Sequence, residues 1–335
     1  MSRRALSGPT DDRHALNRVL LGTLLVALGA ALFGTLSYVA RQAAEAGLQA
    51  LPYVAWRGIA ATGTLLLVSV LIGNRLAGGG RLPDIRALPR ARRPWLIAAA
   101  TFGALLNIAI FAAFLRMNIA VALICFYTFP AIVTIAAVPL YGERLSPVRI
   151  GALLLSLIGL AVVVLAPLFG SEDVVIDIVG VGLALFAAVC QASFVLISGR
   201  GWKPMPTLHV ATWVVGAALA ISIPLTLIAG DAAGLLAPFS TPEAWIWILA
   251  GGVAGAAIPS VAFIAGINII GPSRAAILMT IEPLVGVSLA WLLLPGEQPA
   301  VLQIVGGAAV LVGAAVLQVA PRAPVPPEPE FGPLV

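Results

Sequence analysis

The sequence predicts an all-α membrane protein with ten transmembrane helices that form two inverted five-helix repeats. Three observations lead to this prediction: the composition, the number of long apolar stretches, and the placement of arginine between them. Apolar residues make up 61% of the 335 residues and charged residues only 10%, whereas about a quarter of a soluble domain is charged. Because so few polar residues cannot cover a soluble core of this size, lipid must be the solvent for most of the chain.

Ten apolar stretches are long enough to cross the hydrocarbon core of a bilayer, which takes a helix of about 20 residues. They are residues 20–40, 51–73, 95–115, 119–138, 148–168, 176–198, 209–229, 244–267, 273–294 and 300–319. The links before the fourth and the ninth stretch are so short that each flanking pair is predicted to be a tight helical hairpin. The first stretch is too long for the apolar part of a signal peptide, so we expect it to remain as a membrane anchor.

The basic residues alternate from one connection to the next. Arginines precede the first stretch, fill the second connection between residues 75 and 93, and recur at Arg149, Arg200 and Arg274 in the later even-numbered connections. Because cytoplasmic loops are enriched in lysine and arginine, this pattern predicts an even number of spans with both termini in the cytoplasm. It also explains the net charge of +5 as an orientation signal, so no nucleic-acid partner is expected.

Four segments are predicted along the chain. Residues 1–18 form a cytoplasmic N-terminal segment, 19–169 the first five-helix repeat, 170–320 the second, and 321–335 a proline-rich, disordered cytoplasmic tail. The single lysine, Lys203, stands against many arginines, which is a hint of a GC-rich bacterial genome. We therefore expect the inner membrane of a bacterium.

An internal repeat supports the division into two halves. Residues 126–130 (FYTFP) align with residues 279–283 (MTIEP), which makes Pro130 and Pro283 equivalent. At one constant offset, Phe102-Gly103-Ala104 and Phe111 fall over Ala254-Gly255-Ala256 and Phe263. Since five helices per copy is an odd number, the second copy must be inverted. Inverted repeats are typical of secondary transporters, whose substrate site lies near the membrane midplane between the copies.

The two aligned prolines also predict a local change in helices four and nine. Proline removes one backbone donor from the helical ladder, so the ladder is expected to loosen there. The result is either a hinge or a tolerated kink.

Several motifs carry a family resemblance. They are Trp56-Arg57 at the start of helix two, Gly142-Glu143-Arg144-Leu145-Ser146 after helix four, Glu282-Pro283 with Gly296-Glu297 in and after helix nine, and the glycines of helices five and ten. In these motifs the chain resembles the EamA-like branch of the drug/metabolite transporter superfamily, from about residue 20 to 320. It departs from the family at Phe33-Gly34, where members usually have tryptophan before the glycine.

The resemblance implies an arrangement and an activity. Helices one, three, four, six, eight and nine would surround a central cavity, and helices five and ten would be peripheral. Members of this family move amino acids and other small metabolites, often outward, and the resemblance does not choose among these substrates.

Glu282 is the sharpest candidate for chemistry, because it is the only acidic residue deep within an apolar stretch. Placing a charged carboxylate at a helix centre costs roughly 2.5–3.5 kcal/mol, so such residues usually face an interior and have a partner. Glu282 could carry a proton or bind a cationic group. Alternatively, it packs between helices and accepts a hydrogen bond from backbone freed by Pro283.

Arg57 lies near the outer end of helix two and also has two interpretations. Its guanidinium could bind a substrate carboxylate through two parallel hydrogen bonds. It could equally extend to the outer interface beside Trp56.

The remaining candidates are polar and aromatic residues that share helix faces. Such side chains either line a wet cavity or hold helices together. Asn107 and Phe111 share a face of helix three, Gln191 lies with Phe194 on helix six, and Tyr38 lies near Gly34 on helix one. The predicted substrate-binding residues are Glu282, Arg57, Tyr38, Asn107, Phe111, Tyr127, Gln191 and Phe263.

The function predicted from these features is secondary transport, with export of amino acids or related compounds by alternating access. Efflux of several drugs or cationic compounds is the alternative. An intramembrane enzyme would need paired aspartates, a nucleophile with an intramembrane histidine, or an H-E-x-x-H zinc motif, and the sequence has none of them. We therefore expect no catalytic residue, metal or cofactor. The expected partners are a small-molecule substrate and the lipid bilayer, with proton coupling as a hypothesis and the choice between monomer and homodimer open.

Overall fold

The computed structural model describes residues 9–72, 75, 82–114, 116–117, 119–143, 146–166, 177–293 and 300–319. This part of the chain is helical and contains no strand. The predicted tail at 321–335 and most of the basic connection at 73–81 lie outside the described residues, as do Arg144, Leu145 and Gly296-Glu297.

The helices follow the predicted stretches closely. They are α1 (Pro9–Glu45), α2 (Ala50–Ile72), α3 (Arg93–Phe114), α4 (Ile119–Phe126), α5 (Phe129–Tyr141), α6 (Pro147–Leu165), α7 (Ile178–Ser198), α8 (Thr207–Ile228), α10 (Ala244–Leu249), the π-helical η6 (Ala250–Ala257), α11 (Ile258–Ile270), α12 (Pro272–Leu278), α13 (Ile281–Leu293) and α14 (Val301–Val319). Short helical segments η2 (Ile85–Ala87), η3 (Arg90–Arg92), η5 (Ala233–Leu235) and α9 (Ala237–Ser240) lie in the connections.

The predicted membrane architecture is confirmed. Within the described residues, nine helical stretches are long and apolar enough to cross a membrane, and α14 is a further, shorter apolar helix. Three predicted spans each consist of consecutive segments: α4 with α5, α10 with η6 and α11, and α12 with α13. The first helix extends beyond the predicted apolar stretch at both ends, from Pro9 to Glu45, and an ion pair between Arg41 and Glu45 (Nε to Oε1 3.5 Å) lies in its last turn.

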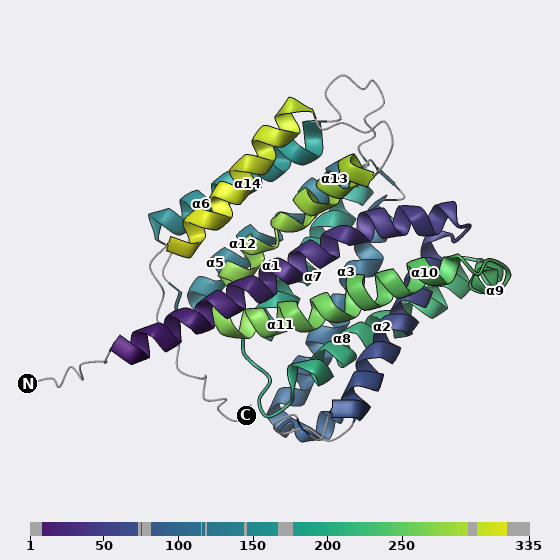
Figure 1. Ribbon diagram of the computed structural model, residues 1–335, viewed down its shortest axis with the longest axis horizontal. Coiled ribbons are helices and arrows are strands. Elements are labelled where there is room, and N and C mark those ends of the chain that lie inside the picture. Colours follow the sequence, from purple (N-terminus) through teal and green to yellow (C-terminus); the bar gives the residue numbers. More distant parts are fainter. Residues whose placement is uncertain are drawn as a thin grey trace, which may run out of the picture.

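Helix α1 runs along the length of the molecule and packs against α11 and α13 (Figure 1). Helices α6 and α14 lie side by side at one edge (Figure 1). Their backbones approach closely, because a Cβ atom on Gly159 would lie only 2.6 Å from the Gly306 carbonyl oxygen. Small residues at such a crossing are the usual means of packing membrane helices. The two ends of the molecule are called the N-terminal end, where α1 and α12 begin, and the α9 end.

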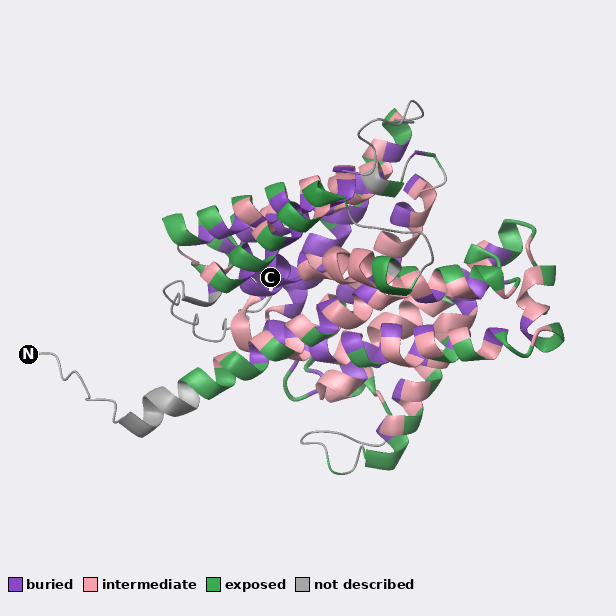
Figure 2. Cartoon of the chain, turned by 45° about the horizontal axis from the view of Figure 1, so that its top comes forward, coloured by how far each residue is buried: buried purple, intermediate pink, exposed green. Residues whose placement is uncertain are grey.

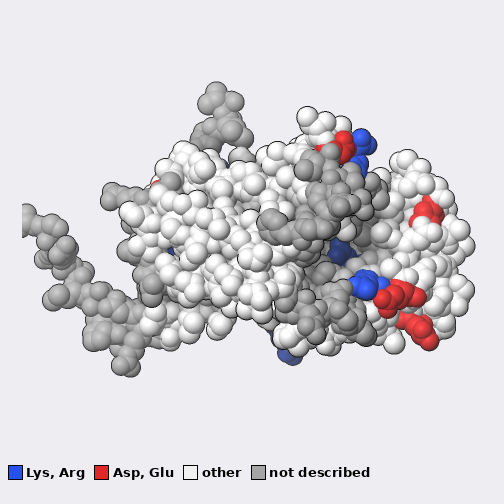
Figure 3. Space-filling view, turned by 90° about the horizontal axis from the view of Figure 1, so that it is seen from above, with Lys and Arg blue, Asp and Glu red and all other residues white. Residues whose placement is uncertain are grey.

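The surface agrees with a lipid environment. Large aliphatic side chains such as Leu24, Leu67 and Ile158 are 57%, 59% and 62% exposed. Exposed residues cover the outward faces of the helices, and buried residues fill the space between them (Figure 2). Most of the described surface seen in Figure 3 is uncharged, and many of the acidic and basic residues visible there lie toward the α9 end.

Candidate functional site

The fourth and ninth predicted spans are interrupted at equivalent positions, as the two prolines predicted. α4 ends at Phe126 and α5 begins at Phe129, while α12 ends at Leu278 and α13 begins at Ile281. A proline ring lacks the amide donor and collides with the carbonyl four residues earlier, which ends the preceding turn. A threonine hydroxyl in each break donates to a carbonyl of that turn, Thr128 to Cys125 and Thr280 to Ile277, both at 2.7 Å.

The two interruptions come together through their side chains. The Tyr127 hydroxyl, from the first break, lies close to the Glu282 carboxylate, from the second, and interacts with it. Glu282 lies in the first turn of α13, where the positive end of the helix dipole favours a negative charge. The partner that an intramembrane acid requires is therefore a hydroxyl from the other repeat.

Burial changes abruptly at Glu282. Residues 272–280, on the side of the N-terminal end, are all buried, whereas residues 281–289 are all half-buried. Of its neighbours, α13 packs chiefly against α1. Along this span, Glu282 therefore lies where a buried segment toward the N-terminal end meets a half-buried segment toward the α9 end.

Helix α1 crosses directly over Glu282. A Cβ atom on Gly34 would lie 2.5 Å from the Glu282 carbonyl oxygen and 2.8 Å from Cβ of Val285. One turn further, Ser37 Oγ lies 3.0 Å from the Cβ position of Gly286. Gly34 is therefore needed for the close approach of α1 to the broken helix.

Arg57 lies on α2 against the π-helical segment η6. Its Cδ is 3.5 Å from the Cβ position of Gly251, and it makes no hydrogen bond or ion pair within the described part of the chain. Its neighbour Trp56 contacts a different segment, where its indole nitrogen donates to the Leu235 carbonyl at 3.0 Å and its ring meets Trp245 edge-on at 5.1 Å.

The other predicted residues do not all gather around Glu282. Phe263 is 2% exposed, with its ring centre 6.5 Å from that of Phe33 and 6.4 Å from that of Phe194. Gln191 is buried on α7. Asn107 donates 2.8 Å to the Gly103 carbonyl of its own helix.

Two aromatic candidates lie in separate clusters. Phe111 meets Phe114 edge-on, with ring centres 6.0 Å apart, beside the packed faces of α3 and α7. Tyr38 meets Trp247 edge-on at 6.2 Å in the cluster toward the α9 end. Within the predicted set, Tyr127 and Glu282 interact with each other across the two repeats.

Sequence reasoning missed two residues at Arg57. Tyr53 precedes Arg57 by four residues and therefore shares its helix face. The second is Gly251, which lies against both side chains. The i, i+4 spacing could have indicated Tyr53, whereas nothing in the sequence predicted the π-helical turn.

Polar groups connect the helices at both ends of the molecule. At the α9 end, Arg116 donates to the Asp177 carboxylate, which lowers the pKa of Asp177 below its ordinary value, and Asp177 also caps α7 at Gly180 (3.2 Å). At the N-terminal end, Arg149 pairs with Glu143 at 3.3 Å, and both side chains are largely buried. The Tyr141 hydroxyl donates to the Leu196 carbonyl nearby on α7.

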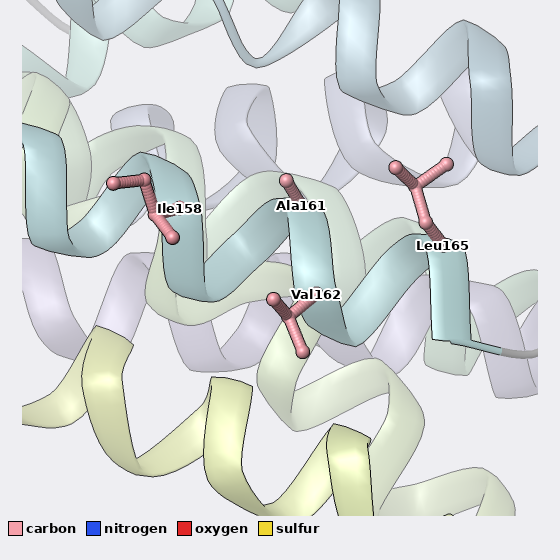
Figure 4. A pocket seen from close by; sticks show the side chains of 4 residues that line it. All are labelled: Ile158, Ala161, Val162 and Leu165. Carbon is pink, nitrogen blue, oxygen red and sulfur yellow. The ribbon is translucent and has the colours of Figure 1, made fainter.

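A shallow groove on α6 has a different character. It has a volume of about 180 Å³ and is lined by Ile158, Ala161, Val162 and Leu165, all on one helix (Figure 4). These aliphatic side chains offer no polar group to orient a polar ligand. The described residues also contain no cluster of histidine, cysteine and acidic side chains suited to a metal ion.

Comparison with known proteins gives two similarities. Residues 20–165 and 178–319 both match the EamA-like transporter family. A solved crystal structure of another protein superimposes with a TM-score of 0.72 at 19% identity, over 88% of this chain and 94% of that one, which shows that the two share a fold. The curated proteins provide no significant sequence match.

Proposed function

The chain belongs to the EamA-like transporter family, a family of multi-pass small-molecule transporters, and on this premise we propose that it exports amino acids or related metabolites by alternating access. The proposed location is a bacterial inner membrane with both termini in the cytoplasm, which the arginine-rich even-numbered connections support. The N-terminal end of the molecule then faces the cytoplasm and the α9 end faces outward.

The contact between Tyr127 and Glu282 is the observation that carries this proposal. A carboxylate at the midplane is unfavourable unless it is protonated or paired. Glu282 can therefore hold either a proton or the ammonium group of a substrate, and exchange of one for the other would couple the two fluxes. Because the hydroxyl and the carboxylate come from the two inverted repeats, a rocking motion between the repeats would change this contact.

The burial boundary at Glu282 supports an alternating cycle. Residues 281–289 are half-buried and residues 272–280 are buried, which fits a state in which the carboxylate would be reached from the α9 side. Export would require the opposite arrangement in another state, with the cytoplasmic half open and the outer half closed. Broken helices can supply such a change, because their freed backbone groups lie at the midplane.

Efflux of cationic compounds remains the second candidate, because the same carboxylate would attract a lipophilic cation. Counterflow in liposomes that contain the purified protein separates the two. We expect labelled amino acids to exchange against unlabelled amino acids inside, with a rate that depends on pH. Exchange of cationic dyes but not of amino acids would favour the second candidate, and exchange of neither class would contradict both.

A further inference from the structure

We propose that Tyr53 and Arg57 of α2, together with the glycine surface of η6, form a binding site for the carboxylate group of the transported substrate. The proposal rests on the transport function above and specifies its substrate class as compounds that carry a carboxylate.

The two side chains converge on one point of η6. Tyr53 and Arg57 are one helical turn apart and share a face of α2. A Cβ atom on Gly251 would lie 3.1 Å from Tyr53 Cζ, nearer still to the hydroxyl oxygen, and 3.5 Å from Arg57 Cδ. The hydroxyl and the base of the guanidinium arm therefore flank the same glycine.

Both groups lack the partners that their positions demand. Tyr53 is 4% exposed and its hydroxyl has no hydrogen-bond partner in the structure described. Arg57 is half-buried within a membrane span, and in the same part of the chain it has no acidic partner. Unpartnered groups of this kind are unfavourable in lipid, so an anion that satisfied both would bind strongly. A guanidinium pairs with the two oxygens of a carboxylate through parallel hydrogen bonds, and the tyrosine hydroxyl can donate a third.

The backbone of η6 makes room for this arrangement. Gly251 and Gly252 let the segment approach α2, because a Cβ atom on Gly252 would lie 2.5 Å from Cβ of Ala60 and 3.0 Å from the Arg57 carbonyl oxygen. The segment is π-helical and is followed by Pro259, which lacks the amide donor that a regular helix needs. Single π-turns occur frequently at functional sites.

The first repeat has no such space. At the constant offset between the repeats, Ala99 and Ala100 occupy the positions equivalent to Gly251 and Gly252, and α3 is an uninterrupted α-helix there. The glycine surface of the site therefore comes from the second repeat, as does Glu282, whereas Tyr53 and Arg57 come from the first. Arg57 lies seven residues from the outer end of α2 and Glu282 eleven residues from the outer end of α13, which places Arg57 about 6 Å nearer that end.

Protection of Arg57 from phenylglyoxal, measured by peptide mass spectrometry on the full-length protein, tests the site without requiring transport. The probes are a mixture of the common amino acids and the corresponding amino-acid amides, which keep the ammonium group but lack the carboxylate. We expect the acids to slow modification of Arg57 at least fivefold and the amides to have no effect. Equal protection by both mixtures, or by neither, would overturn the proposal.

Three conservative variants and one control sharpen the test. Tyr53→Phe removes the third donor, and Gly251→Ala would displace it, because the new Cβ would overlap the Tyr53 hydroxyl. Each variant should therefore lose most of the protection. Gly63→Ala on the same helix has no neighbour within 4 Å of its new Cβ and should keep it. Arg57→Lys keeps the charge but not the planar fork, so it should weaken amino-acid counterflow more than counterflow of amides.

Two further arms separate the remaining explanations. The first arm compares the protein in vesicles of phosphatidylglycerol without amino acids with the protein in vesicles of phosphatidylcholine with amino acids. If Arg57 is protected only in phosphatidylglycerol, the occupant is a lipid headgroup and the proposal is wrong. Protection by acids without any counterflow would retain the site and reject the transport function. Counterflow that is unaffected by Tyr53→Phe, Gly251→Ala and Arg57→Lys would retain transport and reject the site.

Discussion

Glu282 differs from every other acidic side chain of the described chain, because it combines a position inside an apolar span with an interaction with Tyr127 of the other repeat. Its equivalent in the first repeat is Phe129, which is 1% exposed and packs against Phe126 with ring centres 5.4 Å apart. The two repeats are therefore chemically unequal at their breaks. The first break carries the aromatic ring of Phe129, and the second carries the carboxyl group of Glu282.

The first prediction concerns Glu282→Gln, which keeps the shape of the side chain and removes its titrating charge. We expect this variant to fold, because a neutral amide is easier to bury than a carboxylate, and to lose the pH dependence of counterflow. Glu282→Asp should keep some activity with a shifted pH optimum.

Tyr127→Phe is the matched control for this prediction, since it removes only the hydroxyl partner. It should alter the pH profile of the wild-type protein and have little further effect in the Gln variant, because coupled residues are not additive. A Gln variant that transports at the wild-type rate with an unchanged pH profile would show that Glu282 is structural.

The second prediction compares two phenylalanines that the repeat alignment makes equivalent. Phe263 is almost fully buried between Phe33 and Phe194, whereas Phe111 is half-buried. Removing a buried phenylalanine ring costs about 3–5 kcal/mol, so Phe263→Ala should lower the thermal midpoint and the yield of folded protein more than Phe111→Ala. Equal midpoints for the two variants, measured in the same detergent, would contradict the burial difference.

At the scale of elements, the apolar stretches and the prolines predicted most of what the structure contains. Span positions follow from transfer energetics that depend only on local composition, so the predicted ends differ by only a few residues for most helices. The helix breaks before Pro130 and Pro283 can also be predicted from the local sequence, because every proline lacks the backbone amide donor. The contact of Tyr127 with Glu282 is different: it depends on how two distant helices pack, and no local rule specifies it.

The π-helical turn of η6 could not be predicted for a similar reason. Glycine-rich apolar stretches followed by proline are compatible with several backbone conformations. The close approach of α2 to Gly252 and of α1 to Gly255 favours one of these conformations. The choice therefore depends on tertiary packing and not on the local sequence. Shared helix faces could therefore be predicted from residue spacing, whereas the packing of Arg57 against this turn could not.

The third prediction belongs to the start of α7, which is fixed by the Asp177 cap and its pairing with Arg116. The hydrogen bond from Arg116 lowers the pKa of Asp177 below its ordinary value of 3.8. A carboxyl group with a lowered pKa in the folded state stabilises that state above the unfolded pKa, and this contribution is lost as the pH falls through the folded pKa.

Asp177→Asn keeps a capping oxygen and removes the charge. Its thermal midpoint should therefore lie below that of the wild type at pH 6, and the difference should shrink below pH 3.8. Asp84→Asn, at the exposed cap of η2, is the control for a cap outside the helix bundle. A difference that is the same at pH 3 and pH 6 would exclude the ion pair as its cause.

On the scale of the whole molecule, burial is distributed unevenly between the two ends. Buried residues dominate α12 and the adjoining end of α7, where residues 194–198 are all buried. Residues 281–289 of α13 are half-buried, and in the last turns of α1 most residues other than Val39 and Ala43 are half-buried or exposed. Some of the buried polar atoms at the N-terminal end have no hydrogen-bond partner in the described structure, among them Ser198 Oγ, His209 Nε2 and Ser273 Oγ. Such groups would gain partners if that end opened to water in another state.

The last prediction tests this uneven closure with two serine-to-cysteine exchanges of nearly equal size, in a background that lacks Cys125 and Cys190. Ser37, near the α9 end of α1, is exposed beside Gly286, whereas Ser273 is 2% exposed at the start of α12. A thiol reagent that does not cross the membrane should modify Ser37→Cys rapidly from the outer side and leave Ser273→Cys unmodified from either side at rest. A transported substrate supplied from the cytoplasmic side should then increase the labelling of Ser273→Cys from that side and slow that of Ser37→Cys, because alternating access opens one half as it closes the other. Rapid labelling of both cysteines from one side without substrate would contradict the closed cytoplasmic half, and labelling of Ser273→Cys only from the outer side would reverse the proposed orientation.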